Sequence, residues 1–366
     1  MNIIIFLVIL LVLVLVHEFG HFFTAKKFGI RVDEFGFGFP PKLFGFKKGE
    51  TEYSFNLLPL GGFVKIFGEN PDEENMNGPD KERSFINKPR WKQAIVLFAG
   101  VFMNFMLAWF LFSFGLMSGL PTSVGGELKE YELENVNLVI ISVAQNSPAE
   151  KASLKSGDKI IHIQSGNDSV LDINPDTLKS FVVSHEGQEI EIGYLRSKTE
   201  NLRFTTLIPE TSVAGGKPVI GISMDQIGIA KLPILKALWV GMKLTLFITK
   251  GTAIGLYTLI IEGLKGQGSM TAITGPVGMV GIVGDAYEFG FAYLLSFAAL
   301  ISINLAIINL LPFPALDGGR LFFLLIEKIK GSALNPKVAN TANMIGFIIL
   351  IILMLLVTYH DVVKLL

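Results

Sequence analysis

The feature that most constrains this chain is an apolar run beginning at Ile3, which is long enough to cross a bilayer as one helix. Near its end the run contains the sequence His-Glu-Phe-Gly-His at positions 17–21. A helix suits lipid because it satisfies its backbone hydrogen bonds internally. Ionisable side chains at that depth are costly, so three of them together indicate a functional site.

The spacing of these residues suits a metal ion. His17 and His21 are four residues apart and share one helical face, so both rings can reach the same ion. Glu18 can reach a water bound there and act as general base. Zinc takes few nitrogen or oxygen ligands, and a catalytic site leaves one position for water. The alternative is that both histidines are packed polar residues that hydrogen-bond to neighbouring helices.

The composition is that of a membrane protein. Half of the 366 residues are hydrophobic, and the mean hydropathy is +0.52. A net charge of -1 provides no basic surface, so no nucleic-acid partner is predicted. The absence of cysteine excludes disulfides and thiolate metal ligands. The first apolar run lacks a basic leading region and a small-residue cleavage site, so we interpret it as a retained membrane helix.

Four segments are predicted to span the membrane, at about 2–24, 94–118, 292–314 and 340–359. Lysine and arginine are frequent in the connection between the first two segments and in the connection between the last two. By the positive-inside rule these connections are cytoplasmic, so both termini and residues 119–291 face outward. At about 1.5 Å per residue, His17 and His21 then lie deep in the bilayer, towards its cytoplasmic side.

The stretch between residues 35 and 66 has aromatic and β-branched runs broken by glycine and proline, a pattern typical of short hairpin strands. These runs are apolar and directly follow the helix that carries the two histidines. We therefore predict β-hairpins that dip into the membrane beside the site. The alternative is an ordinary amphipathic hairpin on the surface.

The outward region has the pattern of a small α+β domain. Strands are predicted at 138–141, 159–163, 188–195 and 202–208, a short helix within 146–154 and a second helix near 176–184. This order, and the stretch NSPAEKASLKSGDKIIHI in particular, resembles a PDZ domain. Such domains bind extended peptide ends by adding a strand to a sheet edge. The alternative is a small α+β domain without a ligand groove.

Residues 231–265 are apolar enough to span, yet Lys236, Lys243 and Lys250 recur every seven residues on one helical face. This pattern favours a helix that lies in the outer interface with its lysines towards the head groups. A spanning helix is the alternative, and it would conflict with the topology derived from the charges.

A third metal ligand is predicted by elimination. Asp317 is the only acidic residue between Glu288 and Glu327, and the remaining three histidines fall outside the membrane core. Prolines before Asp317 and glycines after it predict irregular backbone. Such backbone is tolerated at membrane depth only where it is buried or lines a wet cavity. The alternative is a helix-ending aspartate near the head groups, paired with Arg320.

Together these motifs resemble the bacterial site-2 proteases, zinc intramembrane metalloproteases of the RseP and RasP type. The resemblance covers most of the chain: HEFGH at 17–21, GFG at 36–38, PLGGFVKI at 59–66, FAG with Asn104 in the second segment, the PDZ-like domain, TGPVG at 274–278 and NLLPFPALDGGR at 309–320. It implies one zinc ion per chain, held by His17, His21 and Asp317, with Glu18 as base. It also implies substrate contacts from Asn309 and Asn304, and from hairpins that hold the unwound substrate in extended form, including Gly36, Gly38, Gly62, Phe63 and Val64.

The predicted fold class is a polytopic α-helical membrane protein with four transmembrane helices, membrane-associated β-hairpins near the active site and one α+β PDZ-like extracytoplasmic domain. The predicted parts are a first membrane half at 1–118, the PDZ-like domain at 126–210, an extracytoplasmic linker with an interfacial amphipathic helix at 211–291 and a second membrane half at 292–366. The resemblance implies a place in the bacterial inner membrane, with the lipid bilayer and single-span membrane proteins as partners. It also implies cleavage of transmembrane segments whose outer domain has been removed, such as anti-sigma factors or remnant signal peptides.

The chain departs from that family in three places. It has one PDZ-like domain where some relatives have two, Val101 where relatives usually have proline, and Gln93 where they commonly have a basic residue.

Two other functions stay open: a metal-free membrane scaffold, and a different membrane metalloenzyme or metal transporter. Zinc stoichiometry distinguishes the scaffold from an enzyme, and cleavage of a membrane-embedded peptide distinguishes a protease from a transporter.

Overall fold

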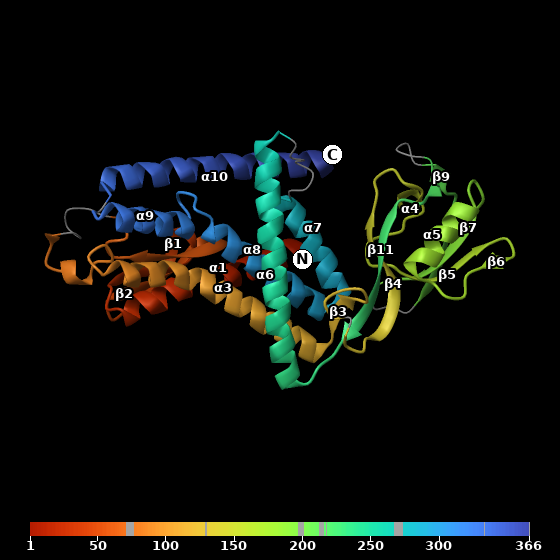
Figure 1. Ribbon diagram of the computed structural model, residues 1–366, viewed down its shortest axis with the longest axis horizontal. Helices are drawn as coiled ribbons and strands as arrows, with labels where there is room; N and C mark the ends of the chain where they lie inside the picture. The colour runs from red at the N-terminus through yellow and green to blue at the C-terminus, as the bar shows by residue number, and fades with distance from the viewer. Residues whose placement is uncertain are drawn as a thin grey trace. The chain divides into compact units, whose positions relative to one another are not determined.

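The structure is a computed structural model that describes residues 1–70, 77–128, 130–196, 201–211, 216, 218–266, 274–332 and 334–365. The chain divides into two compact units (Figure 1). The first unit comprises Met1–Phe112, Leu238–Gly284 and Phe297–Leu366, and the second comprises Ser113–Ala237 and Asp285–Ser296.

Five helices in the described part of the chain are long and apolar enough to cross a membrane. They are α1 (Asn2–Lys27), α3 (Arg90–Ser118), α6 (Ile234–Leu264), α8 (Phe291–Leu310) and α10 (Pro336–Leu365). Four of them correspond to the predicted spans, so the predicted count of four must be corrected to five candidate spans. The additional one is α6, whose lysines are spaced widely enough to leave an 18-residue window with a mean hydropathy of 1.6.

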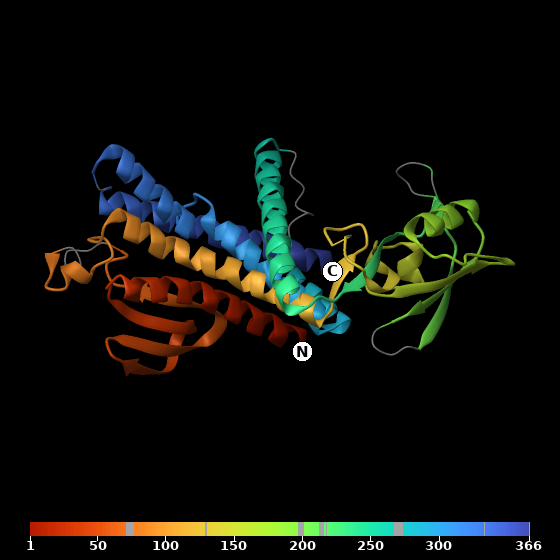
Figure 2. The ribbon, with the colours of Figure 1, turned by 60° about the horizontal axis from the view of Figure 1, so that its bottom comes forward.

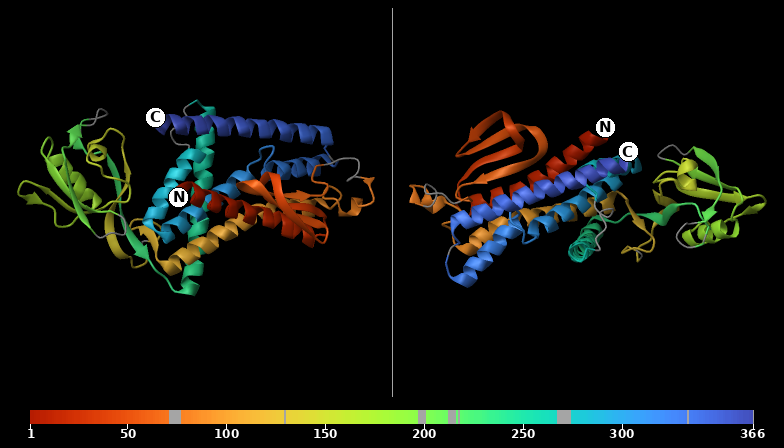
Figure 3. Two further views of the ribbon diagram at one scale, coloured as in Figure 1. Left: turned by 180° about the vertical axis from the view of Figure 1, so that it is seen from behind. Right: turned by 90° about the horizontal axis from the view of Figure 1, so that it is seen from above.

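The direction of α6 within the first unit differs from that of its neighbours. In Figure 1 and in the right-hand view of Figure 3, the α6 ribbon runs transverse to α1, α3 and α10. If α1, α3 and α10 span the membrane, a helix transverse to them runs along the membrane plane. The interfacial placement of residues 231–265 therefore stays a prediction, even though the length and composition of α6 would also allow it to span.

Two shorter helices complete the first unit. The first is α7 (Pro276–Phe289), which begins inside the TGPVG motif, and the second is α9 (Asp317–Lys330). The long α8 ends at Leu310, because Pro312 and Pro314 cannot continue a helix. The chain then makes an irregular turn and enters α9 at Asp317.

A single long antiparallel hairpin replaces the short hairpins that were predicted. It pairs β1 (Val32–Lys48) with β2 (Thr51–Ile66) and lies alongside α1 (Figure 2). At its base Val32 and Ile66 are buried in a cluster with Ala25 and Phe85. Farther out the hairpin exposes large apolar side chains, including Leu43, Phe44, Phe46 and Leu57. Exposed apolar surface of this kind favours the predicted contact with lipid.

Glu50, in the turn of this hairpin, anchors it to the end of α1. Its carboxylate accepts a hydrogen bond of 2.6 Å from Lys26 Nζ and another from Arg83. Partial burial alone would raise the pKa of Glu50, but the hydrogen bonds and charges of Lys26 and Arg83 outweigh it and lower the pKa.

This ion-pair network predicts a pH dependence of stability. The contribution of Glu50 is present above the ordinary pKa of 4.5 and is lost as the pH falls below it, through the lowered pKa of the folded state. We expect Glu50→Gln to cost about 0.5–1 kcal/mol at pH 7 and to reduce the loss of stability on acidification, measured by thermal unfolding. Glu52→Gln, which removes only an exposed pair with Lys42, is the control. Identical acid profiles for the native chain and Glu50→Gln would contradict the assignment.

The second unit is built around a seven-stranded sheet in the order β3-β11-β4-β5-β7-β8, with β6 paired to β5. The strands are β3 (Leu120–Ser123), β4 (Glu134–Val143), β5 (Lys159–Ser165), β6 (Asp168–Ser169), β7 (Ile190–Leu195), β8 (Leu202–Leu207) and β11 (Ile222–Ala230), while β9 (Glu210–Thr211) pairs with β10 (Pro218–Val219). The strands predicted near 138, 159, 188 and 202 are present. Two further strands, β3 and β11, come from outside residues 126–210.

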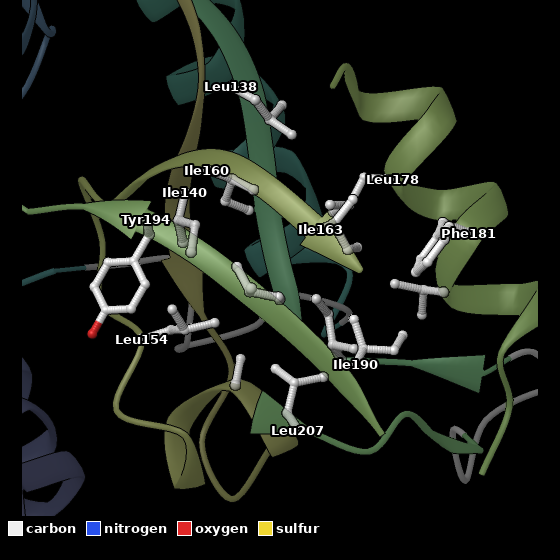
Figure 4. Close-up of a cluster of buried hydrophobic side chains, with 14 residues drawn as sticks. Leu138, Ile140, Leu154, Ile160, Ile163, Leu178, Phe181, Ile190, Tyr194 and Leu207 are labelled. Atoms are coloured by element: carbon white, nitrogen blue, oxygen red, sulfur yellow. The ribbon is translucent and has the colours of Figure 1, made fainter. Parts of the chain in front are cut away.

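Two short helices cover this sheet, α4 (Pro148–Lys151) and α5 (Pro175–Ser184), as predicted. Each begins with a capping side chain followed by proline, Ser147 for α4 and Asn174 for α5. Leu178 and Phe181 of α5 point towards Ile163 and Ile190 of the sheet in a common hydrophobic core (Figure 4). The result is a β-rich, PDZ-like region.

Candidate active site

Two histidines of α1 and one aspartate of α9 meet in the first unit. His17 Nε2 lies 3.0 Å from Asp317 Oδ2, and His21 Nε2 lies 3.3 Å from the same oxygen. The two Nε2 atoms are 3.2 Å apart. Both histidines are buried. The structure therefore brings together the three predicted ligands, although Asp317 is 300 residues from His17 in sequence.

The donor set fits zinc. Tetrahedral ligands at about 2.0–2.2 Å from zinc are about 3.3–3.6 Å from one another, close to the separations found here. Two imidazole nitrogens with one carboxylate oxygen are also a set typical of catalytic zinc sites, which keep a fourth position for water. His17, His21 and Asp317 thus form a candidate metal site.

The second helix of the unit, α3, orients both imidazole rings. His21 Nδ1 lies 2.8 Å from the carbonyl oxygen of Val96 and donates its proton there, so Nε2 keeps a free lone pair. His17 Nδ1 lies 3.4 Å from the side-chain amide of Asn104, which is fully buried. The atom that faces Nδ1 is the amide nitrogen, and the amide oxygen of Asn104 is buried without a hydrogen-bond partner among the described residues. When His17 Nε2 binds a metal, Nδ1 carries the proton, and the Asn104 amide accepts it once the amide group has turned over to present its oxygen. The sequence pointed to Asn104 only as part of a motif.

Two glycines let α1 and α3 approach closely at this level. A Cβ on Gly20 would lie 2.4 Å from the carbonyl oxygen of Ala99. A Cβ on Gly100 would lie 2.4 Å from His21 Nε2 and 2.8 Å from His17 Cε1. Gly100 therefore leaves open the space beside the metal-facing nitrogen, which gives the FAG motif a physical role.

Asp317 lies at the end of an irregular turn, not within the turn. The structure places it as the first residue of α9, after a turn in which Ala315 has φ of +76°. Gly318 and Gly319 pack against backbone carbonyls of that turn, where a Cβ would lie 2.2 Å or less from an oxygen. The alternative pairing of Asp317 with Arg320 is not found, because Arg320 forms an ion pair with Glu69.

A cavity of about 200 Å³ adjoins two of the three candidate ligands, His17 and Asp317. Glu18, the residue after His17 in α1, also lines this cavity. So does Asn309 of α8, whose Nδ2 lies 3.5 Å from His17 Nε2. Leu305 and Val14 complete much of its apolar wall. Asn304 is not among its lining residues. The arrangement can hold a water and a carbonyl group between a carboxylate, an amide and a metal ion.

Comparison with known proteins identifies the family. The model of peptidase family M50 matches residues 5–353. The chain belongs to peptidase family M50. A protein of Clostridium acetobutylicum, named provisionally as a zinc metalloprotease, is 33% identical over 363 residues, 99% of this chain and 97% of that one. The regulator of sigma-W protease RasP of Bacillus subtilis is 30% identical over 441 residues, 100% of this chain and 99% of that one.

This M50 protein is therefore a zinc metalloprotease and a multi-pass membrane protein, as the sequence motifs predicted. Among solved structures, the PDZ domain of an SdrC-like protein of Listeria monocytogenes matches 24% of this chain and 86% of that domain, with 20% identity and a TM-score of 0.21.

The hairpin of this M50 protease runs past its candidate site. Phe63 of β2 pairs with Gly36 of β1, and its ring occupies the space that a Cβ on Gly36 would fill. Gly62 faces Leu15 of α1, where a Cβ would lie 2.9 Å from Leu15 Cδ2. Val64, two residues further along β2, packs against the same buried cluster as Phe22 of α1. The predicted residues of β2 thus lie beside α1 at the level of Glu18.

Proposed function

We propose that this protease cleaves peptide bonds within the transmembrane segments of single-span membrane proteins. The observation that carries the proposal is the position of the site: two ligands and Glu18 lie well inside α1, a candidate span of 26 residues. The cavity beside them is lined by α1, α3, α8 and the start of α9. A substrate that reaches this cavity must itself enter the membrane.

The residues of the site have complementary roles. His17, His21 and Asp317 hold one zinc ion per chain, and zinc, when bound, acts as a Lewis acid that polarises a carbonyl group and makes water more acidic. Glu18 accepts the proton of the attacking water and passes it to the leaving amine. Asn309 donates a hydrogen bond to the substrate backbone or to the developing oxyanion. Asn304, one turn and a residue earlier on α8, contacts substrate outside the cavity.

A substrate helix must unwind before it can be cut, because its backbone hydrogen bonds shield the peptide bond. The β1–β2 hairpin supports a way to compensate the lost hydrogen bonds, since an extended segment can add to a strand edge. Gly36 and Gly38 on β1, with Gly62, Phe63 and Val64 on β2, are the residues that we assign to this contact. The apolar outer part of the hairpin keeps it in lipid.

The PDZ-like region is assigned to the outer face of the bacterial inner membrane, with both termini, while the site faces the cytoplasmic side. A groove of about 940 Å³ in the second unit, between α5 and the strands β10 and β11, supports binding of an extended peptide end. The region would admit substrates whose outer domain has been removed. The name of the Bacillus subtilis relative, a regulator of sigma-W, favours anti-sigma factors over remnant signal peptides as substrates.

Cleavage of a single-span model substrate by the purified full-length chain tests this function. We expect cuts within the span, located by mass spectrometry, and faster cleavage when the outer domain of the substrate is absent. Cleavage confined to regions outside the span would overturn the proposal.

The assigned ligands predict loss of both metal and activity on substitution. Asp317→Ala and His21→Ala each remove one of three protein ligands, so we expect zinc content to fall from one per chain to near zero, with no proteolysis. His185→Ala, which changes a buried histidine in the second unit, is the control and should keep both. Full zinc content in Asp317→Ala, measured by elemental analysis, would remove Asp317 from the ligand set.

A further inference from the structure

The last helix, α10, contacts the turn that carries Asp317. The backbone N–H of Ala315 donates a hydrogen bond of 3.2 Å to Asn343 Oδ1 on α10. One turn along, Gly346 lies against the carbonyl of Pro314, and a Cβ there would be only 2.4 Å from that oxygen. Asn343 and Gly346 are three residues apart and so share one face of α10. That face of α10 presents to the turn the Asn343 oxygen, which accepts a hydrogen bond, and Gly346, whose lack of a side chain allows the close approach.

The turn adopts a conformation that it would not keep by itself. Ala315 has φ of +76°, in the left-handed region that residues with a Cβ avoid. Such conformations persist only where the surroundings over-determine them, and they cluster at functional sites. The Asn343 acceptor is a direct restraint on this residue, because it binds the Ala315 N–H itself.

The restraint lies close to the metal site. Asp317 follows Ala315 by two residues, so a change in the Ala315 dihedral angles swings the start of α9 and the carboxylate that it carries. On its other side the turn is enclosed by Gly318 and Gly319, which pack against the carbonyls of Leu310 and Phe313. The turn is thus held from α9 on one side and from α10 on the other.

We propose that α10 restrains the turn between α8 and α9 that ends at Asp317, and we call this contact the clasp. Asn343 and Gly346 are its positioning residues, which hold Asp317 at the distance found from His17 and His21. The clasp acts on the metal site through backbone conformation and touches neither substrate nor metal. It rests on the assignment of Asp317 as a zinc ligand made above.

Zinc affinity of the full-length chain, measured by competition with a chelator, tests the clasp without reference to proteolysis. Asn343→Ala removes the acceptor, and we expect zinc affinity to fall about 10- to 100-fold, as for other residues that orient metal ligands. Asn343→Asp keeps an oxygen acceptor at the same place and should stay within about threefold of the native affinity. Asn340→Ala, an exposed asparagine one turn earlier on α10, is the matched control.

A second pair of variants tests the turn itself. Gly346→Ala pushes against the Pro314 carbonyl and should weaken zinc binding, with Asn343 still present. Ala315→Gly removes the steric cost of the left-handed conformation. Combined with Asn343→Ala, it should therefore restore part of the lost affinity.

The outcomes separate the clasp from a general structural role. Unchanged zinc affinity in Asn343→Ala, or equal losses in Asn343→Ala and Asn343→Asp, would overturn the clasp. If Asn343→Ala fails to fold, judged by thermal unfolding without zinc, Gly346→Ala decides instead, and native zinc affinity in that variant would overturn the clasp. A native chain without stoichiometric zinc would overturn the proposed function instead.

Discussion

Glu18→Gln is expected to abolish proteolysis while zinc stays bound. The amide has the size of the carboxylate but cannot accept a proton from the attacking water, so the general-base contribution of about 10²–10⁴ in rate is lost. Zinc stays because Glu18 is not one of the three residues whose donor atoms converge. The measurement is the rate of cleavage of a single-span substrate lacking its outer domain, alongside zinc content by elemental analysis.

Glu18→Asp provides the companion variant. It keeps a base but withdraws it by one methylene group, so we expect a partial loss of rate between the native chain and Glu18→Gln. Equal cleavage by native chain and Glu18→Gln would show that Glu18 is not the base. If both are inert towards this substrate although zinc is bound, the substrate is the wrong one, and the same comparison is made with another single-span protein.

Gly100→Ala is expected to disrupt the metal site although Gly100 is not a ligand. The added methyl carbon would lie 2.4 Å from His21 Nε2, well inside van der Waals contact, so either the ring or α3 must move by about an ångström. Displacements of that size cost about 10²-fold in catalysis, and metal affinity should fall comparably. Chelator competition gives the zinc affinity, and cleavage of the model substrate gives the rate.

A glycine elsewhere on the same helix controls for helix propensity and folding. In Gly115→Ala the added methyl group meets only the end of the Leu120 side chain, which can move aside. We expect native zinc affinity and native cleavage for this variant. Native zinc affinity in Gly100→Ala would mean that the two helices separate here at little cost, and that the close approach of α3 does not shape the site.

The site joins residues from both ends of the chain on four helices. Two ion pairs attach the hairpin to this assembly. Glu50 in the hairpin turn pairs with Lys26 at the end of α1, and Glu69, just after β2, pairs with Arg320 of α9. The Arg320 pair links the segment after β2 to the helix that begins with Asp317. Hairpin and metal site are therefore parts of one packed structure, in which a substrate held by the hairpin would lie at a set distance from Glu18.

Local patterns in the sequence determined much of this protein. The spacing of His17 and His21 was readable because helical periodicity alone places residues four apart on one face. Length and hydropathy located α1, α3, α8 and α10, since spanning a bilayer requires little more than an unbroken apolar run. Asp317 could be named by elimination, because acidic residues are rare in the membrane half that follows Glu288.

The tertiary structure decided what periodicity and composition do not encode, namely which elements pack together. It brought Asp317 to His17 across 300 residues, and it supplied the Val96 carbonyl, the Asn104 amide and the bare surface of Gly100 from α3. It likewise set Asn343 of α10 against the strained turn at Ala315. A glycine or an asparagine within an apolar helix looks the same in sequence whether it faces lipid or a ligand, because its role comes from the neighbour that the fold places opposite it.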